Sequence, residues 1–195
     1  MEMVELKSKI EGSVASGERM VSVPESTIKA YEARIRELES QALTDSLTGL
    51  GNRRYFDDTL LSIKGGIARE EEHGKRRAEV ACIYFDLDKF KEVNDTMGHD
   101  AGDALLKKFA QILISNSRKS DQAFRLGGDE FIVLLHGEGR EDAQAYVKRV
   151  AKDVAAVAGL EASAGICTLR EAGEDVDIMV KTSDGILRAF KDERR

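Results

Sequence analysis

Short apolar runs and longer amphipathic stretches alternate along this chain. Runs rich in β-branched and aromatic residues predict four strands, at residues 79–88, 122–126, 131–135 and 160–168. Helices are expected between and around them, at about 24–44, 53–73, 101–117, 140–157 and from 176 onward. Helices interleaved with hairpin strands predict an α+β fold, an antiparallel-rich central sheet flanked by helices and preceded by an N-terminal helical stalk.

The same pattern divides the chain into segments. Residues 1–23 show no regular period and are interpreted as a linker or the remnant of an upstream region. In residues 24–44, apolar side chains recur at spacings of three and four, as in a coiled-coil seam: Ile28, Tyr31, Ile35, Leu38 and Ala42. An amphipathic helix packed on its own domain is the alternative, because two heptads are short. Residues 45–195 are expected to form one domain.

Two glycine features interrupt the helical pattern. Gly49 and Gly51 are expected to end the stalk, and Asn52 can cap the helix that follows. This joint either transmits the geometry of the stalk or is simply a well-capped turn. Within the next helix, Gly65 and Gly66 are expected to weaken or kink it.

A glycine pair separates two of the predicted strands. Gly127 and Gly128 can supply the positive φ that a tight hairpin needs. Asp129 and Glu130 then lie at the hairpin tip. Taken alone, acidic residues in such a turn are usually solvated turn formers.

A second acidic strand end changes this interpretation. The apolar strand before it stops at Asp86 and Asp88. If this strand lies beside the hairpin, Asp86 approaches Asp129 and Glu130, and three carboxylates repel one another unless cations lie among them. Magnesium prefers such hard oxygen ligands together with substrate phosphates, so the pattern predicts a Mg²⁺ site.

Several motifs together resemble the GGDEF family of diguanylate cyclases. The string Gly-Gly-Asp-Glu-Phe at 127–131 follows Phe-Asp-Leu-Asp-Lys-Phe-Lys at 85–91 and Asn-Asp-Thr-Met-Gly-His-Asp-Ala-Gly-Asp at 94–103. With two further motifs they occur in family order across 45–195. The resemblance implies a catalytic domain like the palm of nucleotide cyclases and polymerases. Such a domain joins two GTP into cyclic di-GMP and two pyrophosphates at a homodimer interface, with product feedback inhibition.

The resemblance also assigns roles to individual residues. It places two Mg²⁺ ions, for which Mn²⁺ can substitute, on Asp86, the Leu87 carbonyl, Asp129 and Glu130. Glu130 is also expected to help deprotonate the ribose 3′-hydroxyl, and Asp129 and Lys91 to act with it in catalysis. Substrate contacts are implied for Asn94, Asp103, Gly127, Gly128, Lys191 and Arg195.

Two of these assignments concern the guanine base. An aspartate accepts the ring N–H and amine of guanine, and an asparagine serves the remaining edge, which Asn94 and Asp103 would do here. Without the resemblance, Asn94 would be interpreted as a turn residue and Asp103 as an acid at a helix N-terminus. The resemblance also implies that aspartate at position 103 points to the all-guanine product, because family members with adenine-containing products tend to carry a smaller polar residue there.

Arg118 and Asp121 lie at the spacing before Gly127 where the family carries its inhibitory Arg-x-x-Asp, which binds cyclic di-GMP. Taken alone, they would be a solvated surface pair. The last helix departs from the family, with Arg188 where a tyrosine is usual and Ile186 where an alanine is usual. Lys191 and Arg195 still match its phosphate-binding positions, although a basic last turn also complements the helix dipole.

Composition argues against three further properties: binding to a nucleic-acid polymer, a disulfide framework and a membrane span. The net charge of −6 without a basic run argues against a nucleic-acid polymer as partner. Cys82 and Cys167 lie in apolar runs, a pattern of reduced core cysteines. No apolar stretch approaches the ~18 residues of a membrane span, so a cytoplasmic location is expected.

Overall fold

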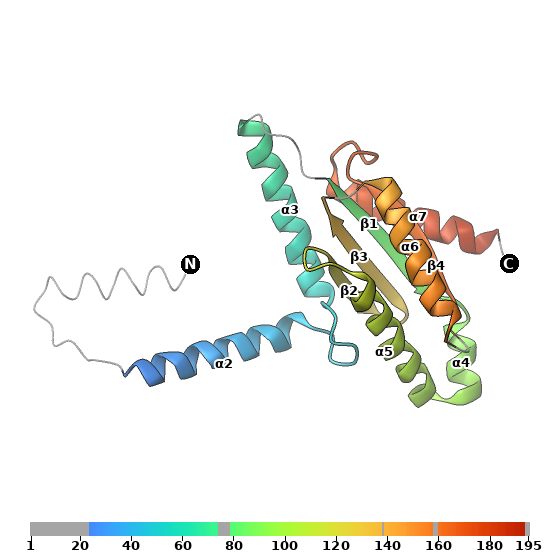
Figure 1. The fold of residues 1–195 in the computed structure, drawn as a ribbon, viewed down its shortest axis with the longest axis horizontal. Helices are drawn as coiled ribbons and strands as arrows, with labels where there is room; N and C mark the ends of the chain where they lie inside the picture. Colours follow the sequence, from blue (N-terminus) through green and yellow to red (C-terminus); the bar gives the residue numbers. More distant parts are fainter. Residues whose placement is uncertain (1–23, 74–78, 138, 158–159, 194–195) are drawn as a thin grey trace, which may run out of the picture. The chain divides into compact units, whose positions relative to one another are not determined.

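The structure, a computed structural model, describes residues 24–73, 79–137, 139–157 and 160–193 (Figure 1). Its elements are α2 (Glu25–Leu43), α3 (Arg53–His73), β1 (Val80–Leu87), α4 (Phe90–Met97), α5 (His99–Asn116), β2 (Gln122–Gly127), β3 (Glu130–His136), α6 (Arg140–Ala155), β4 (Ala162–Thr168) and α7 (Val176–Asp192). The chain divides into two compact units, Met1–Ser40 and Gln41–Arg195.

Helix α2 forms most of the described part of the first unit. The Pro24 carbonyl accepts the first backbone hydrogen bonds, and an exposed Lys29–Glu25 ion pair of 2.7 Å joins successive turns. Three predicted seam side chains are exposed, at 48% for Ile28, 68% for Tyr31 and 48% for Ile35. Their pairing in a coiled coil stays a prediction, and the interpretation of residues 1–23 lies outside the described residues.

The second unit is built on one four-stranded sheet. Its strand order is β2-β3-β1-β4, and each neighbouring pair is antiparallel. This confirms the predicted α+β class. Strand β1 lies in the interior of the sheet, between β3 and β4, so its side chains are covered on both faces and its sequence is apolar almost throughout.

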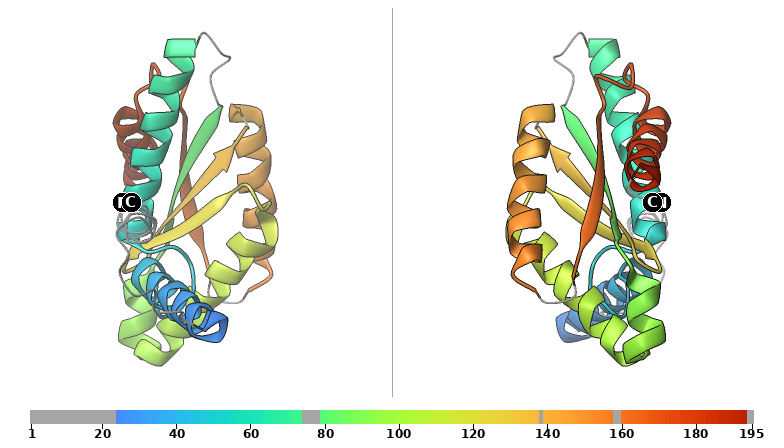
Figure 2. Two further views of the ribbon diagram at one scale, coloured as in Figure 1. Left: turned by 90° about the vertical axis from the view of Figure 1, so that its left-hand side faces the viewer. Right: turned by 90° about the vertical axis from the view of Figure 1, so that its right-hand side faces the viewer.

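Helices cover both faces of the sheet, as Figure 2 shows. Side chains of α5 and α6 pack on one face, and side chains of α3 and α7 pack on the other. The side chains of β1 alternate between the two hydrophobic cores. Ile83 and Phe85 lie in the core on the α5–α6 side, and Cys82 and Tyr84 lie in the core on the α3–α7 side. None of the helices in the described ranges is both long and apolar enough to cross a membrane.

The structure differs from the predicted elements at two places. Helix α4 was not predicted, because eight residues carry too few apolar positions to show a period. It is bracketed by Lys89, at φ 57°, and Gly98, at φ 85°. Helix α3 continues unbroken through Gly65 and Gly66, so the predicted interruption does not occur, and any weakening stays untested.

Candidate active site

The two acidic strand ends lie side by side. Asp86 is directly opposite Glu130 in the β1–β3 register, and the Leu87 N–H points at the Asp129 carbonyl at 3.4 Å. This confirms that the strand ending in Asp86 lies beside the hairpin. The juxtaposition arises because β1 and β3 are antiparallel, so the end of one strand meets the start of the other.

The hairpin tip depends on its two glycines. Gly127 has φ 146° and Gly128 has φ 53°, the region that side chains other than glycine rarely adopt. Both are exposed, while Asp129 and Glu130 are half-buried. The predicted hairpin is therefore confirmed, and its glycines present open backbone next to the acidic pair.

The Lys191 side chain contacts the two acidic residues at the end of β1, Asp86 and Asp88. Its ammonium forms an ion pair with the Asp86 carboxylate and is 3.4 Å from the Asp88 Oδ1. Burial raises the pKa of Asp86 and the charge of Asp129 adds to this, while Lys191 opposes both. Asp88 also accepts a hydrogen bond from the Ser163 hydroxyl at 2.8 Å. The lysine predicted to bind phosphate thus neutralises one carboxylate predicted to bind metal, Asp86, and lies beside Asp88.

The expected cluster of three carboxylates is not assembled in this arrangement. Within the described ranges, no three acidic, histidine or cysteine side chains are close enough together to hold a metal ion. Cationic side chains lie beside two of the predicted ligands, since Lys191 pairs with Asp86 and the Arg53 guanidinium lies 4.0 Å from Glu130. The donors are nonetheless hard oxygens on adjacent strands, which fit Mg²⁺ if the two cations give way.

The predicted guanine-binding residues lie on two packed helices. Asn94 is in the second half of α4, and Asp103 is near the start of α5, beyond the Gly98 bend. Both side chains are half-buried, whereas Lys91 on α4 is exposed. The structure therefore brings Asn94 and Asp103 onto one helical hairpin that begins directly after the acidic end of β1.

Arg118 and Asp121 form a tight turn before β2. The Asp121 carboxylate accepts a hydrogen bond from the Arg118 backbone N–H at 2.8 Å, which holds the two residues together. A surface pocket of about 630 Å³ adjoins this turn and includes Asp121, Gln122 and His136 in its lining. The pair lies at the end of β2 that is opposite the hairpin tip.

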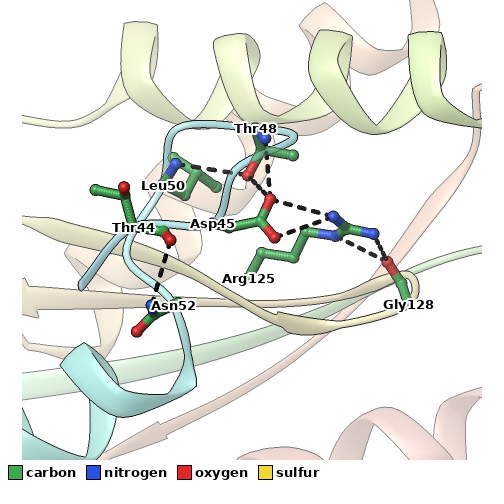
Figure 3. Close-up of polar contacts among 7 residues, drawn as sticks. All are labelled: Thr44, Asp45, Thr48, Leu50, Asn52, Arg125 and Gly128. Atoms are coloured by element: carbon green, nitrogen blue, oxygen red, sulfur yellow. Dashed lines mark hydrogen bonds and ion pairs between the residues drawn. The ribbon is translucent and has the colours of Figure 1, made fainter. Parts of the chain in front are cut away.

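Sequence reasoning assigned no role to Arg125, which joins the hairpin to the turn after α2 (Figure 3). Its guanidinium donates to both carboxylate oxygens of Asp45, at 3.1 and 3.2 Å, and to the Gly128 carbonyl, at 2.8 and 3.0 Å. Thr48 also donates to Asp45, from its backbone at 2.9 Å and its hydroxyl at 2.6 Å. The only signal in the sequence was the position of Arg125 two residues before the glycine pair.

Asn52 completes this joint. Its side-chain oxygen accepts from the Tyr55 N–H at 3.0 Å, which confirms the predicted cap of α3. Its amide nitrogen donates to the carbonyls of Ala42 at 2.9 Å and Thr44 at 3.2 Å. The start of α3 is therefore attached to the residues that end α2.

Comparison with known proteins identifies the family of this chain. Residues 42–195 match the family model described as diguanylate cyclase, GGDEF domain. The chain belongs to the GGDEF family. This GGDEF chain is 46% identical over 102 residues to diguanylate cyclase DgcS of Shewanella oneidensis. The aligned region makes up 52% of this chain and 32% of DgcS. It is 33% identical over 159 residues to the response regulator PleD of Caulobacter vibrioides. That aligned region makes up 76% of this chain and 34% of PleD. The chain thus spans about a third of the length of these relatives.

Solved GGDEF structures share the fold. The GGDEF domain of DgcB from Caulobacter crescentus, in complex with c-di-GMP, has a TM-score of 0.70 at 27% identity, covering 79% of this chain and 92% of that one. SiaD from Pseudomonas aeruginosa, in complex with its activator SiaC, has a TM-score of 0.68 at 28% identity, covering 98% of this chain and 74% of SiaD.

Helix α7 contains the two residues that depart from the family pattern, Ile186 and Arg188. Arg188 forms an ion pair of 2.9 Å with Asp184 one turn earlier, and Ile186 is 41% exposed. Neither residue replaces Lys191, which points at Asp86. Arg195 lies outside the described residues.

Proposed function

We propose that this chain is a diguanylate cyclase domain that condenses two GTP into cyclic di-GMP and two pyrophosphates. The observation that carries the proposal is the pairing of Asp86 with Glu130 at the end of β1. Helices α4 and α5, which hold Asn94 and Asp103, follow directly after that end of the strand. Relatives and structural neighbours named for this activity support it.

In the proposed reaction, the ribose 3′-hydroxyl of one GTP attacks the α-phosphate of a second. The new P–O ester bond forms as the bond to pyrophosphate breaks, and a second transfer closes the ring. Glu130 accepts the hydroxyl proton, and Lys91 and Lys191 offset negative charge on the phosphates, with Arg195 assigned the same role. Because each GTP lies on a different subunit, the reaction needs a homodimer, which the stalk would align.

Asp86, Asp129, Glu130 and the Leu87 carbonyl would hold two Mg²⁺ ions, or Mn²⁺ in their place. When bound, such ions polarise the attacked phosphate and stabilise the leaving group. Lys191 has to leave Asp86 for this, and the move would carry its charge toward the triphosphate. The ion pair thus suits a resting state before substrate binds.

The same ion pair also favours a second candidate, a non-catalytic module that binds GTP or cyclic di-GMP. In a sensor the lysine would stay on Asp86. Arg118 and Asp121 would bind the dinucleotide in either case, as an inhibitor site of the enzyme or as the sensing site of the module.

The test is incubation of the purified chain with GTP and Mg²⁺, followed by chromatography and mass analysis of the products. Glu130→Gln should abolish cyclic di-GMP, while Glu141→Gln, an equal change on the exposed start of α6, should leave it unaltered. Output that falls as product accumulates, and no longer does so in Arg118→Ala, supports feedback at that turn. Absence of product at high protein concentration, with binding of added cyclic di-GMP, would establish the module instead.

A further inference from the structure

Gly102 is a point of close approach between α4 and α5. A Cβ atom placed on Gly102 would overlap the Asn94 Oδ1 and lie 3.0 Å from the Asn94 Cγ and 3.2 Å from the Phe90 Cζ. Gly102 itself is buried, and Asn94 is half-buried. The Asn94 amide therefore lies against the bare backbone of α5.

Backbone conformation does not explain this glycine. Gly102 is inside α5, and its φ is not positive, unlike that of Gly98 at the bend. Alanine is the better helix former at such a position, because it loses less conformational freedom than glycine. What favours glycine here is the space that the Asn94 side chain occupies.

Packing, rather than hydrogen bonding, holds the Asn94 side chain. Its amide makes no hydrogen bond to another residue in the described part of the chain, and its Oδ1 faces Gly102. Phe90 packs against the α5–α6 core, and its Cζ also lies close to Gly102. The shape of the surface at Gly102 thus determines where the amide points.

We infer that Gly102 is a positioning residue for guanine recognition, because it alone leaves room for Asn94 in its binding orientation. The inference rests on the proposed function, in which Asn94 reads the guanine edge. A methyl group at position 102 would push the flexible end of Asn94 aside, while the Phe90 ring would need to shift by only a few tenths of an ångström. The fold is then retained, and only the alignment of the amide is lost.

The test measures binding of 3′-deoxy-GTP and 3′-deoxy-ATP, which lack the attacking hydroxyl and cannot be cyclised. In Gly102→Ala the affinity for the guanine nucleotide should fall by about tenfold or more, the usual effect of a lost buried hydrogen bond, with little change for the adenine nucleotide. Gly65→Ala is the matched control, since nothing lies within 4 Å of a Cβ there, and it should leave both affinities unchanged.

Asn94→Ala and the double variant separate the possible failures. If Asn94→Ala and the double variant lose the same guanine preference as Gly102→Ala, the inference is supported. If Asn94→Ala loses it and Gly102→Ala keeps it, the inference is overturned. If Asn94→Ala keeps it, the guanine role in the proposed function fails, and the inference fails with it. Should Gly102→Ala unfold the chain, refolding by added Asn94→Ala would support the contact, and an unfolded double variant would overturn it.

Discussion

Arg125 and Asp45 join the hairpin tip to the turn after α2, through two hydrogen bonds of 3.1 and 3.2 Å across 80 positions of sequence. The side chains are only 12% and 22% exposed, so the pair is shielded from water. Because Arg125 also holds the Gly128 carbonyl, a movement of the turn at Asp45 acts on the backbone beside Asp129. This contact gives the joint a physical connection to the candidate active site.

Replacing Arg125 by methionine should destabilise the fold. The Asp45 carboxylate would stay largely buried without its cation, which typically costs about 3 kcal/mol. Urea unfolding measures the difference, and Lys29→Met, which breaks an ion pair whose side chains are 71% and 80% exposed, should change stability by less than about 0.5 kcal/mol. Equal stabilities of Arg125→Met and wild type would contradict the prediction.

The same carboxylate makes stability depend on pH. Burial by itself would raise the pKa of Asp45, but hydrogen bonds from Thr48 and Arg125 outweigh burial and lower that pKa below its ordinary 3.8. A carboxyl with a lowered pKa stabilises the folded state above its unfolded value, and this contribution is lost as pH falls through the folded pKa. The gap in unfolding free energy between wild type and Asp45→Asn should be full at pH 7 and shrink below 3.8. A gap that stays constant in urea titrations down to pH 3 argues against it.

The Lys191–Asp86 ion pair predicts competition with divalent cations. In nucleotide-free protein, Lys191→Gln should bind Mn²⁺ several-fold to about tenfold more tightly, because the carboxylates of Asp86 and Asp88 lose a competing charge. The same variant should bind 3′-deoxy-GTP less well. Electron paramagnetic resonance of free Mn²⁺ measures the first effect.

Arg188→Gln is the control for overall charge, since it removes an equal charge from α7 while Arg188 pairs with Asp184 rather than Asp86. If both variants shift Mn²⁺ affinity equally, the effect is one of net charge and the competition does not exist.

Gly165→Ala should destabilise the sheet. A Cβ there would overlap the Ser183 carbonyl oxygen and lie 2.6 Å from the Leu187 nitrogen, both in the backbone of α7. Backbone atoms cannot rotate away, so β4 and α7 must separate, at a cost of about 1–3 kcal/mol. Gly185→Ala, on α7 with nothing within 4 Å of its Cβ, should be neutral or stabilising in thermal unfolding. An unchanged melting temperature for Gly165→Ala would refute the steric argument.

The two cysteines should be unreactive in the folded chain. Burial raises the pKa of Cys82 to about 12, and it raises the pKa of Cys167 as well. Both thiols are free and buried, as the apolar pattern predicted. Because the thiolate is the reactive form, a disulfide reagent at pH 8 should label neither cysteine until denaturant is added. Fast labelling of the native protein would show that the α3–α7 side of the sheet opens.

The sequence by itself determined the order of most elements and the main chemical groups. The runs around Gly127 and Gly128 predicted the hairpin because local turn chemistry requires positive φ at that point. The acidic end of β1, from Asp86 onward, was visible because a buried strand is apolar until it reaches an edge. Helix α4 was missed, since two turns between Lys89 and Gly98 contain too little periodicity.

Only the tertiary structure decided which charges pair. Lys191 and Asp86 are 105 positions apart, and Arg125 and Asp45 are 80 apart, so no local period relates them. Nor could periodicity show that Gly102 is required by the Asn94 side chain rather than by backbone conformation. Turn signals and apolar periodicity can be read from near neighbours in sequence, whereas ion pairing and close packing depend on which distant segments the sheet brings together.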